Sequence, residues 1–381
     1  MVFSAAFRPF FFAAGLWGAG AVPAWLLSYS GSAALPGAFP PFVWHVHEMV
    51  FGFAFASAAG FLLTAIPNWT GRLPLRGAPL AALAGLWLAG RLALLLSALL
   101  GPLATAAIDL AFPLALTALV ARELVAGRNW RNLPMLAALS LLLAGSLLVH
   151  LQAIGLTYTA LLGNRLGVAT LLMLIALIGG RIVPSFTRNW LAKRQAGGAM
   201  PAPSGPLDLA ALAVTLAALA AWVASPGGPV MQWLTLAAGL ALALRLSRWR
   251  GLATLSEPLL FVLHAGYGWL AFGLAALGLS GFVPFLPQSA ALHALTVGAI
   301  GTMTLAVMTR ATLGHSGRPL SADRATAAVY LLVTLAALAR VAAPLSGGAY
   351  LTLTWTAAIA WSCAFLLFVV AYRGPLLQPG K

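Results

Sequence analysis

Apolar stretches long enough to cross a membrane recur along the whole chain. A helix needs about 20 apolar residues to span a bilayer, and clusters of Pro, Gly and Arg divide this sequence into twelve such stretches. We predict spans at 7–29, 45–66, 79–99, 102–125, 133–155, 163–184, 206–225, 229–248, 257–279, 288–311, 323–343 and 349–372. The expected fold is therefore an all-α polytopic membrane protein with about twelve transmembrane helices.

The chain is basic, and many of its basic residues lie between the predicted spans. The net charge is +15, yet only 7% of the 381 residues are charged. In a soluble protein such an excess would suggest nucleic acid as a partner, but here the basic residues lie in short loops between spans. We therefore expect the protein to lie in a lipid bilayer, and we expect no nucleic acid as a partner. The single cysteine, Cys363, excludes a disulfide framework and cysteine-based metal sites.

The same basic residues predict how the chain is oriented. Of the 21 Lys and Arg residues, all but Arg91, Arg165 and Arg340 fall on one side of a twelve-span arrangement. The positive-inside rule then places both termini in the cytoplasm. We expect one integral membrane domain over residues 1–381. Its longest polar segment, residues 193–206, is predicted to be a flexible cytoplasmic loop.

Two histidines and a carboxylate stand at the predicted start of the second span. His45, His47 and Glu48 account for a third of the six histidines and for one of only six acidic residues. Ionisable groups inside an apolar helix are costly and usually functional. With the predicted orientation, these three residues lie near the outer face of the membrane.

The remaining histidines fall at different predicted depths. His150, near the end of the fifth span, and His293, near the start of the tenth, share the outer band with His45 and His47. His264 lies about 9 Å from the inner end of the ninth span. His315 is expected in a solvated cytoplasmic loop.

Histidines that share a depth on different helices are candidates for binding a metal or cofactor. Neutral imidazole is a good ligand of haem iron and copper, and bundle proteins build such sites from facing helices. His45 and His47 are about 200° apart around a helix, so we expect one of them, His47, to point inward. We predict a metal site that uses His47 and His293, with His45 and His150 as further cofactor ligands.

Two polar residues are candidates for supporting roles. Glu48 is expected to orient a ligand imidazole or to carry protons, and otherwise to be an interfacial carboxylate favoured by the helix dipole. His264, with Tyr267 one turn further along, cannot bind the outer metal at the predicted depth. It is a candidate ligand for a second centre or for one face of a haem, or a hydrogen-bonding contact between helices.

The second and tenth spans share a residue spacing. His47 and His293 are each followed at the fifth position by a glycine, Gly52 and Gly298, and in both cases a Gly-Arg pair begins 19 residues after that glycine. If the sixth span is the third counterpart, the chain consists of three four-helix repeats. Shared apolar composition is the alternative explanation of the common spacing.

Several of these motifs together resemble the NnrS family. The resemblance rests on Phe7–Phe11, Trp44–Met49, Gly60–Arg72, Arg181–Pro184, Leu263–Tyr267 and the stretch from His293 to Leu320. It implies a bacterial inner-membrane protein of twelve spans that contains haem and copper. It also implies a role in nitric oxide metabolism and nitrosative stress, with nitric oxide or a related small molecule as partner and an unidentified electron donor. The histidines of the matching motifs are His45, His47, His264 and His293, with Glu48 and Tyr267 beside them.

Two other functions are compatible with the residues alone. A transporter of a small molecule, or of a metal or haem complex, would explain the twelve spans and the many Pro and Gly residues that interrupt them. A gas sensor would need an output domain, and the loops are too short to supply one. We therefore favour a redox or gas-binding haem–copper protein and keep transport as the alternative.

Overall fold

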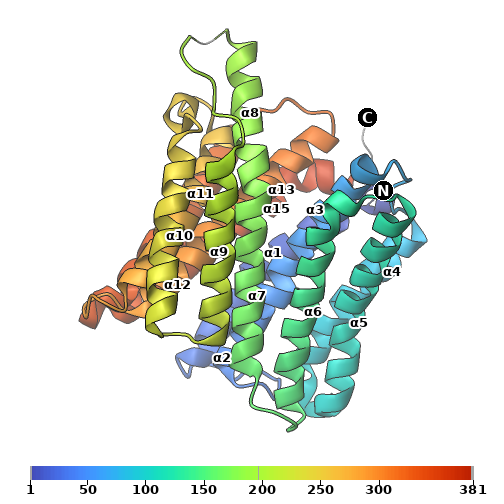
Figure 1. The fold of residues 1–381 in the computed structure, drawn as a ribbon. Helices are drawn as coiled ribbons and strands as arrows, with labels where there is room; N and C mark the ends of the chain where they lie inside the picture. Colours follow the sequence, from blue (N-terminus) through green and yellow to red (C-terminus); the bar gives the residue numbers. More distant parts are fainter. Residues whose placement is uncertain (1, 196, 379–381) are drawn as a thin grey trace. The chain divides into compact units, whose positions relative to one another are not determined.

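Helices make up almost all of the computed structural model, which describes residues 2–195 and 197–378 (Figure 1). Twelve helical stretches are long and apolar enough to cross a membrane, and no strand occurs among the described residues. The helices are α1 Phe7–Tyr29, α2 Pro41–His47, α3 Phe55–Thr70, α4 Ala78–Leu95, α5 Ser97–Ala126, α6 Leu133–Ala153, α7 Ala160–Leu174, α8 Gly180–Lys193, α9 Pro206–Ala224, α10 Pro229–Ser247, α11 Pro258–Leu279, α12 Gln288–His293, α13 Thr302–His315, α14 Arg324–Ala342 and α15 Tyr350–Leu377. The predicted all-α membrane fold with twelve spans is confirmed.

The second span begins earlier than the sequence predicted. Its helix starts at Pro41, about one turn before the predicted start, and continues without a break to Thr70. Proline is favoured in the first turn of a helix, where its missing N–H is not needed. His45 and His47 therefore lie inside a formed helix.

Three of the spans contain a π-helical segment. These segments are Glu48–Ala54 between α2 and α3, Ile175–Gly179 between α7 and α8, and Ala294–Gly301 between α12 and α13. Wider turns of this kind often occur at functional sites because they rotate side chains out of the regular α-helical register. The three helices are the second, sixth and tenth spans. The sequence matched the second to the tenth, and the sixth was their conditional third counterpart. The threefold repeat itself stays a prediction.

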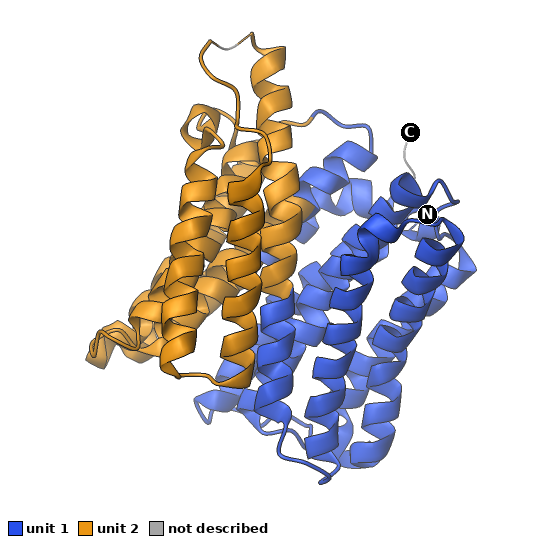
Figure 2. Ribbon diagram, viewed as in Figure 1, with its two compact units in different colours: residues 1–170, 308–319, 365–381 blue, residues 171–307, 320–364 orange. Residues whose placement is uncertain are grey.

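The described chain forms two compact units (Figure 2). Unit 1 comprises residues 1–170, 308–319 and 365–381, and unit 2 comprises residues 171–307 and 320–364. Unit 1 contains α1 to α6, and unit 2 contains α8 to α12 and α14, while α7, α13 and α15 contribute residues to both. That residues 1–381 form a single integral membrane domain stays a prediction.

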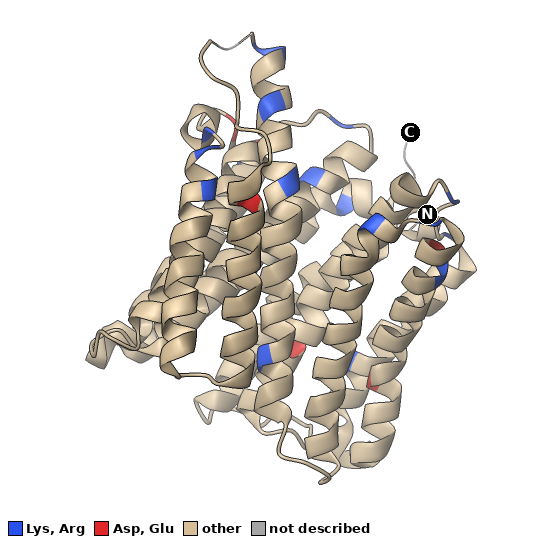
Figure 3. Ribbon diagram, viewed as in Figure 1, with Lys and Arg blue, Asp and Glu red and all other residues tan. Residues whose placement is uncertain are grey.

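Charged side chains are distributed unevenly along the helices of each unit. In each unit most Lys and Arg residues lie toward one end, and in unit 1 this is the end with the two termini (Figure 3). Arg8 near the N-terminus donates a hydrogen bond to the carbonyl oxygen of Gln378 near the C-terminus, so these two parts of the chain meet. That this end faces the cytoplasm stays a prediction. Lys381 lies outside the described residues.

The predicted loop at residues 193–206 coincides with the connection between α8 and α9. Lys193 is the last residue of α8 and Pro206 the first of α9, and the described residues between them form no helix. Residue 196 lies outside the described residues. Arg188 and Arg250 hold its backbone through hydrogen bonds to the carbonyl oxygens of Pro201 and Ala199. Its flexibility stays a prediction.

Small residues let the helices of unit 1 approach closely around the second span. A Cβ atom on Gly18 of α1 would lie 2.9 Å from the ring of Phe53, and one on Gly60 would lie 2.8 Å from the ring of Phe11. Phe53 also packs edge-on against Phe365 at 5.0 Å. These contacts fix the second span against α1 and α15 and so determine which side chains of that span face the interior.

Candidate metal centre

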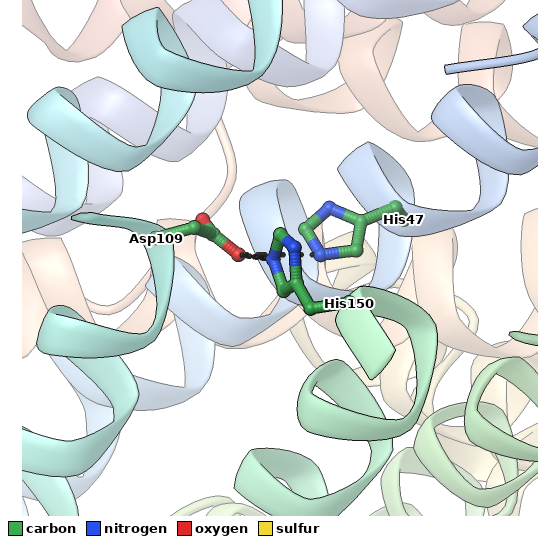
Figure 4. Close-up of side chains that lie close together, drawn as sticks. All are labelled: His47, Asp109 and His150. Atoms are coloured by element: carbon green, nitrogen blue, oxygen red, sulfur yellow. Dashed lines mark hydrogen bonds and ion pairs between the residues drawn. The ribbon is translucent and has the colours of Figure 1, made fainter. Parts of the chain in front are cut away.

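Three side chains from three helices of unit 1 converge in the interior of that unit (Figure 4). His47 is the last residue of α2, Asp109 lies in α5 and His150 lies in α6. One potential ligand atom from each lies within 4.8 Å of the other two, and all three residues are buried. We call this group the His47–Asp109–His150 cluster.

The distances within the cluster suit a single metal ion. Oδ2 of Asp109 lies 2.8 Å from Nε2 of His150 and 3.3 Å from Nε2 of His47. Ligands at about 2.0–2.2 Å from a tetrahedral ion stand roughly 3.3–3.6 Å apart. The 3.3 Å separation fits such an ion, whereas the 2.8 Å separation would have to lengthen when an ion binds. Ser146, one turn before His150, has its hydroxyl 3.3 Å from Nε2 of His47 and donates to Asp109.

A buried ion-pair network supports the cluster on the side of α4. Arg91 donates to Glu48 through Nη1 at 2.6 Å and to Asp109 through Nη2. Trp17 donates to the other oxygen of Glu48 at 2.6 Å, and Nδ1 of His47 lies 3.4 Å from Glu48. Glu48 is completely buried, so its interpretation as an interfacial carboxylate is wrong. Instead it holds Arg91 and the ring of His47 in place.

The formal charges of this network favour a cation. Two carboxylates, Glu48 and Asp109, face one guanidinium, that of Arg91, and all three groups are at most 2% exposed. A net negative charge inside a membrane protein is costly without a compensating positive charge. A bound metal ion or a proton on one of the two histidines supplies that charge.

The sequence reasoning missed Asp109 and assigned Arg91 no partner. Arg91 comes 10 residues before Gly101, and Asp109 comes 8 residues after it. Gly101 has a φ of 74° and interrupts the helix, so the chain reverses direction near it. Opposite charges at nearly equal distances from such a turn lie at the same depth, and this signal was available in the sequence.

His45 and His47 point in different directions, as expected. His47 is fully buried, whereas His45 is half-buried and stacks on Trp25 with 4.1 Å between ring centroids. His150 lies beside His47, with 5.4 Å between ring centroids. His45 therefore stands apart from the three side chains of the cluster, and its role as a cofactor ligand stays a prediction.

His293 belongs to unit 2. Its Nδ1 lies 2.6 Å from the carbonyl oxygen of Ser289, an atom that can only accept, so Nδ1 carries the proton and Nε2 carries the lone pair. A histidine that donates one ring nitrogen to a backbone carbonyl is the usual arrangement for binding a metal through the other nitrogen. The predicted metal site that joins His47 with His293 stays a prediction.

His264 and Tyr267 lie in a second buried polar group, within unit 2. The Thr187 hydroxyl donates to the carbonyl oxygen of Val183, so His264, at 2.9 Å, donates to it through Nε2. The hydroxyl of Tyr267 accepts from Arg245 at 2.9 Å. His264 thus makes a contact between helices, which was one of its predicted roles.

The charges around Tyr267 differ from those around Asp109. Arg245 pairs with Asp208 at 2.7 Å, and Arg248 approaches the same carboxylate at 3.3 Å. Two guanidinium groups therefore face one carboxylate, which disfavours a metal cation. Arg245 also donates to the carbonyl oxygen of Ala176 in the π-helical segment at 3.0 Å. This group stabilises the helix pair and does not resemble a metal site.

His315 is the last residue of α13, so its expected position in a loop is wrong. It is exposed, as expected, and its ring packs 5.8 Å from that of Phe7. The helix extends past the predicted end at 311 because no Pro or Gly interrupts it before Gly314. His315 lies outside the cluster and offers a control for substitutions of buried histidines.

Gly52 in the first π-helical segment is expected to tolerate no side chain. A Cβ atom there would lie 2.7 Å from Nη1 of Arg91 and 2.8 Å from Oε2 of Glu48. Gly52→Ala should therefore displace the ion pair and destabilise the protein by about 1–3 kcal/mol. Thermal unfolding in detergent measures this loss.

Gly85→Ala in α4 is the matched control for this substitution. A Cβ atom at Gly85 would meet nothing within 4 Å, so we expect no loss and a gain of up to about 1 kcal/mol from helix propensity. Equal melting temperatures for Gly52→Ala and Gly85→Ala would contradict the close approach of Arg91 to the second span.

Comparison with known proteins gives one match. The model of the NnrS family, described as NnrS protein, matches residues 1–379. No curated protein matches the chain.

Proposed function

The chain belongs to the NnrS family, and from this premise we propose that it is a haem- and copper-binding membrane protein that protects the cell against nitric oxide. The multi-pass membrane fold supports this proposal, and we place the protein in the bacterial inner membrane. The observation that carries the proposal is the buried, negatively charged His47–Asp109–His150 cluster. We assign the copper ion to this cluster.

The donor set of the cluster fits copper. Two imidazole nitrogens and one carboxylate oxygen are ligands that Cu²⁺ prefers. Nδ1 of His150 is buried and has no hydrogen-bond partner in the part of the chain that the structure describes. Ser146 and Glu48 hold His47 from two sides and orient its ring. When bound, copper would supply one-electron chemistry or a binding position for nitric oxide.

The same cluster does not fit a haem. A haem iron is bound through a flat macrocycle, and Nε2 of His150 and Oδ2 of Asp109 are only 2.8 Å apart, which leaves no room for one between them. We therefore assign haem to His293, whose Nδ1–H donates to Ser289 and leaves Nε2 to bind iron.

Transport is the second candidate function, and one observation favours it. Buried chains of carboxylates, histidines and arginine inside membrane spans also serve as proton relays in transporters. Glu48, Arg91, Asp109 and the two histidines form such a chain. In this reading a proton supplies the positive charge that the cluster lacks, and no metal is bound.

Growth under a nitric oxide donor tests the proposed function. In a strain that lacks the gene, the wild-type protein should restore growth, and so should the control His315→Gln. His150→Gln removes one ligand without adding a charge, and we expect it to restore little or no growth at equal protein levels. Full protection by a His150→Gln protein that binds no copper would contradict the proposal.

A further inference from the structure

A pocket of about 590 Å³ opens at the end of unit 1 that carries the chain termini. It lies between the last turns of α3 and α5 and the loop 71–77, whose Gly77 N–H donates to the carbonyl oxygen of Phe3. The pocket is separate from the His47–Asp109–His150 cluster, none of whose residues line it. Its role is therefore independent of the proposed function.

Three arginines line the rim of this pocket. Arg72, Arg76 and Arg122 share the lining with a single carboxylate, that of Glu123, so the pocket carries a net positive charge. Glu123 accepts from Nε of Arg72 and from Nη2 of Arg122, the latter at 2.7 Å. Arg76 has no hydrogen bond or ion pair with any residue that the structure describes. The rim therefore retains unused guanidinium N–H donors, which suit the oxygens of a phosphate.

The inner wall of the pocket is apolar and extends into the membrane span. Leu63, Ile66 and Leu119 form this wall. Leu63 lies seven residues before the end of α3 at Thr70, or about 10 Å into the helix. An inorganic phosphate or a nucleotide would leave this apolar surface without a partner.

The walls of the pocket are held in fixed positions. Asn129 donates to the carbonyl oxygen of Trp69, and a Cβ atom on Gly127 would lie 2.6 Å from Thr70. These contacts join the ends of α3 and α5. Pro74 in the loop restricts its backbone further. The arginines therefore project from a formed site and not from a loose loop.

We propose that this pocket binds an anionic phospholipid from the membrane leaflet on its own side. The phosphate of the lipid pairs with the arginines, and one acyl chain lies against Leu63, Ile66 and Leu119. The combination of a cationic rim and an apolar wall at the end of two membrane spans carries this assignment. Leu73, which also lines the pocket and is 87% exposed, would enter the interfacial region of the same leaflet.

Native mass spectrometry of the full-length protein in detergent tests the proposal, with phosphatidylglycerol and phosphatidylcholine as probes. We expect the wild type to retain phosphatidylglycerol and not phosphatidylcholine. Arg76→Gln should weaken phosphatidylglycerol binding about fivefold, because each arginine contributes about that factor to anionic-lipid attraction. Arg76 is exposed and has no partner, so its replacement should leave the fold intact.

Arg131→Gln is the matched control, since Arg131 is also exposed and precedes α6 at the same end of unit 1. It should change phosphatidylglycerol binding by less than about twofold. Equal losses of phosphatidylglycerol binding in the two variants would mean that general surface charge attracts the lipid. This result would overturn the proposed binding site. Displacement of phosphatidylglycerol by millimolar inorganic phosphate would identify a phosphate site and overturn the role of the acyl chain.

Discussion

Replacing Arg91 with leucine should destabilise the protein by about 3–5 kcal/mol. Arg91 is the guanidinium that pairs with both Glu48 and Asp109, and it is only 2% exposed. Its loss would leave two carboxylates buried together without a positive charge from α4. We expect most of the variant to be misfolded in the membrane and the remainder to unfold at a much lower temperature in detergent.

A rescue experiment separates the charge of Arg91 from its size. Neutralising both carboxylates in the same chain, through Glu48→Gln and Asp109→Asn, should recover much of the stability that Arg91→Leu loses, because no unpaired charge remains. The exposed control Arg131→Leu should change stability by less than about 0.5 kcal/mol. If Arg91→Leu unfolds at the wild-type temperature, the network does not stabilise unit 1.

His293→Ala should remove most of the haem while leaving the copper in place. The reason is that His293 has its Nε2 lone pair available, whereas the proposed copper ligands His47, Asp109 and His150 all lie in unit 1. The visible spectrum of the purified protein measures haem through its Soret band. Atomic absorption of the same sample measures copper.

His264→Ala provides the comparison for His293→Ala. His264 donates to Thr187, and a Cβ atom on Gly251 would lie 2.8 Å from its Nδ1, so little space remains beside that nitrogen. We expect this variant to keep the Soret band. Loss of copper together with haem in His293→Ala would instead favour one metal site shared by His47 and His293, as the sequence predicted.

The number of spans and the inward direction of His47 could be predicted from the sequence for simple physical reasons. Apolar length sets the number of helices that cross a bilayer. The angle of about 200° between His45 and His47 means that only one of them can face the interior of a regular helix. Depth estimates also placed His150 and His47 in one band, and the structure brings the two rings together.

The composition of the cluster could not be predicted because depth does not specify which helices are neighbours. His293 shared the predicted band with His47, yet Asp109 and Ser146 are the side chains that His47 contacts together with His150. In a chain with six acidic residues, a carboxylate in the middle of an apolar span was itself a strong signal.

The π-helical segments could not be predicted either. Sequence periodicity distinguishes helix from strand, but the difference between i→i+4 and i→i+5 hydrogen bonds over five to eight residues leaves no clear pattern in the sequence. The shared spacing of the second and tenth spans did include Gly52 and Gly298, which lie in two of these segments. The structure gives a reason for both glycines, since a Cβ atom would meet Arg91 at Gly52 and the ring of Trp269 at Gly298.

The copper content of the purified protein tests the central claim most directly. Wild type and His315→Gln should each contain about one copper ion per chain, and His150→Gln should contain almost none while keeping its haem. Such a result would assign the ion to the His47–Asp109–His150 cluster. Equal copper in His150→Gln and wild type, or no copper in the wild type when copper is supplied, would contradict the claim.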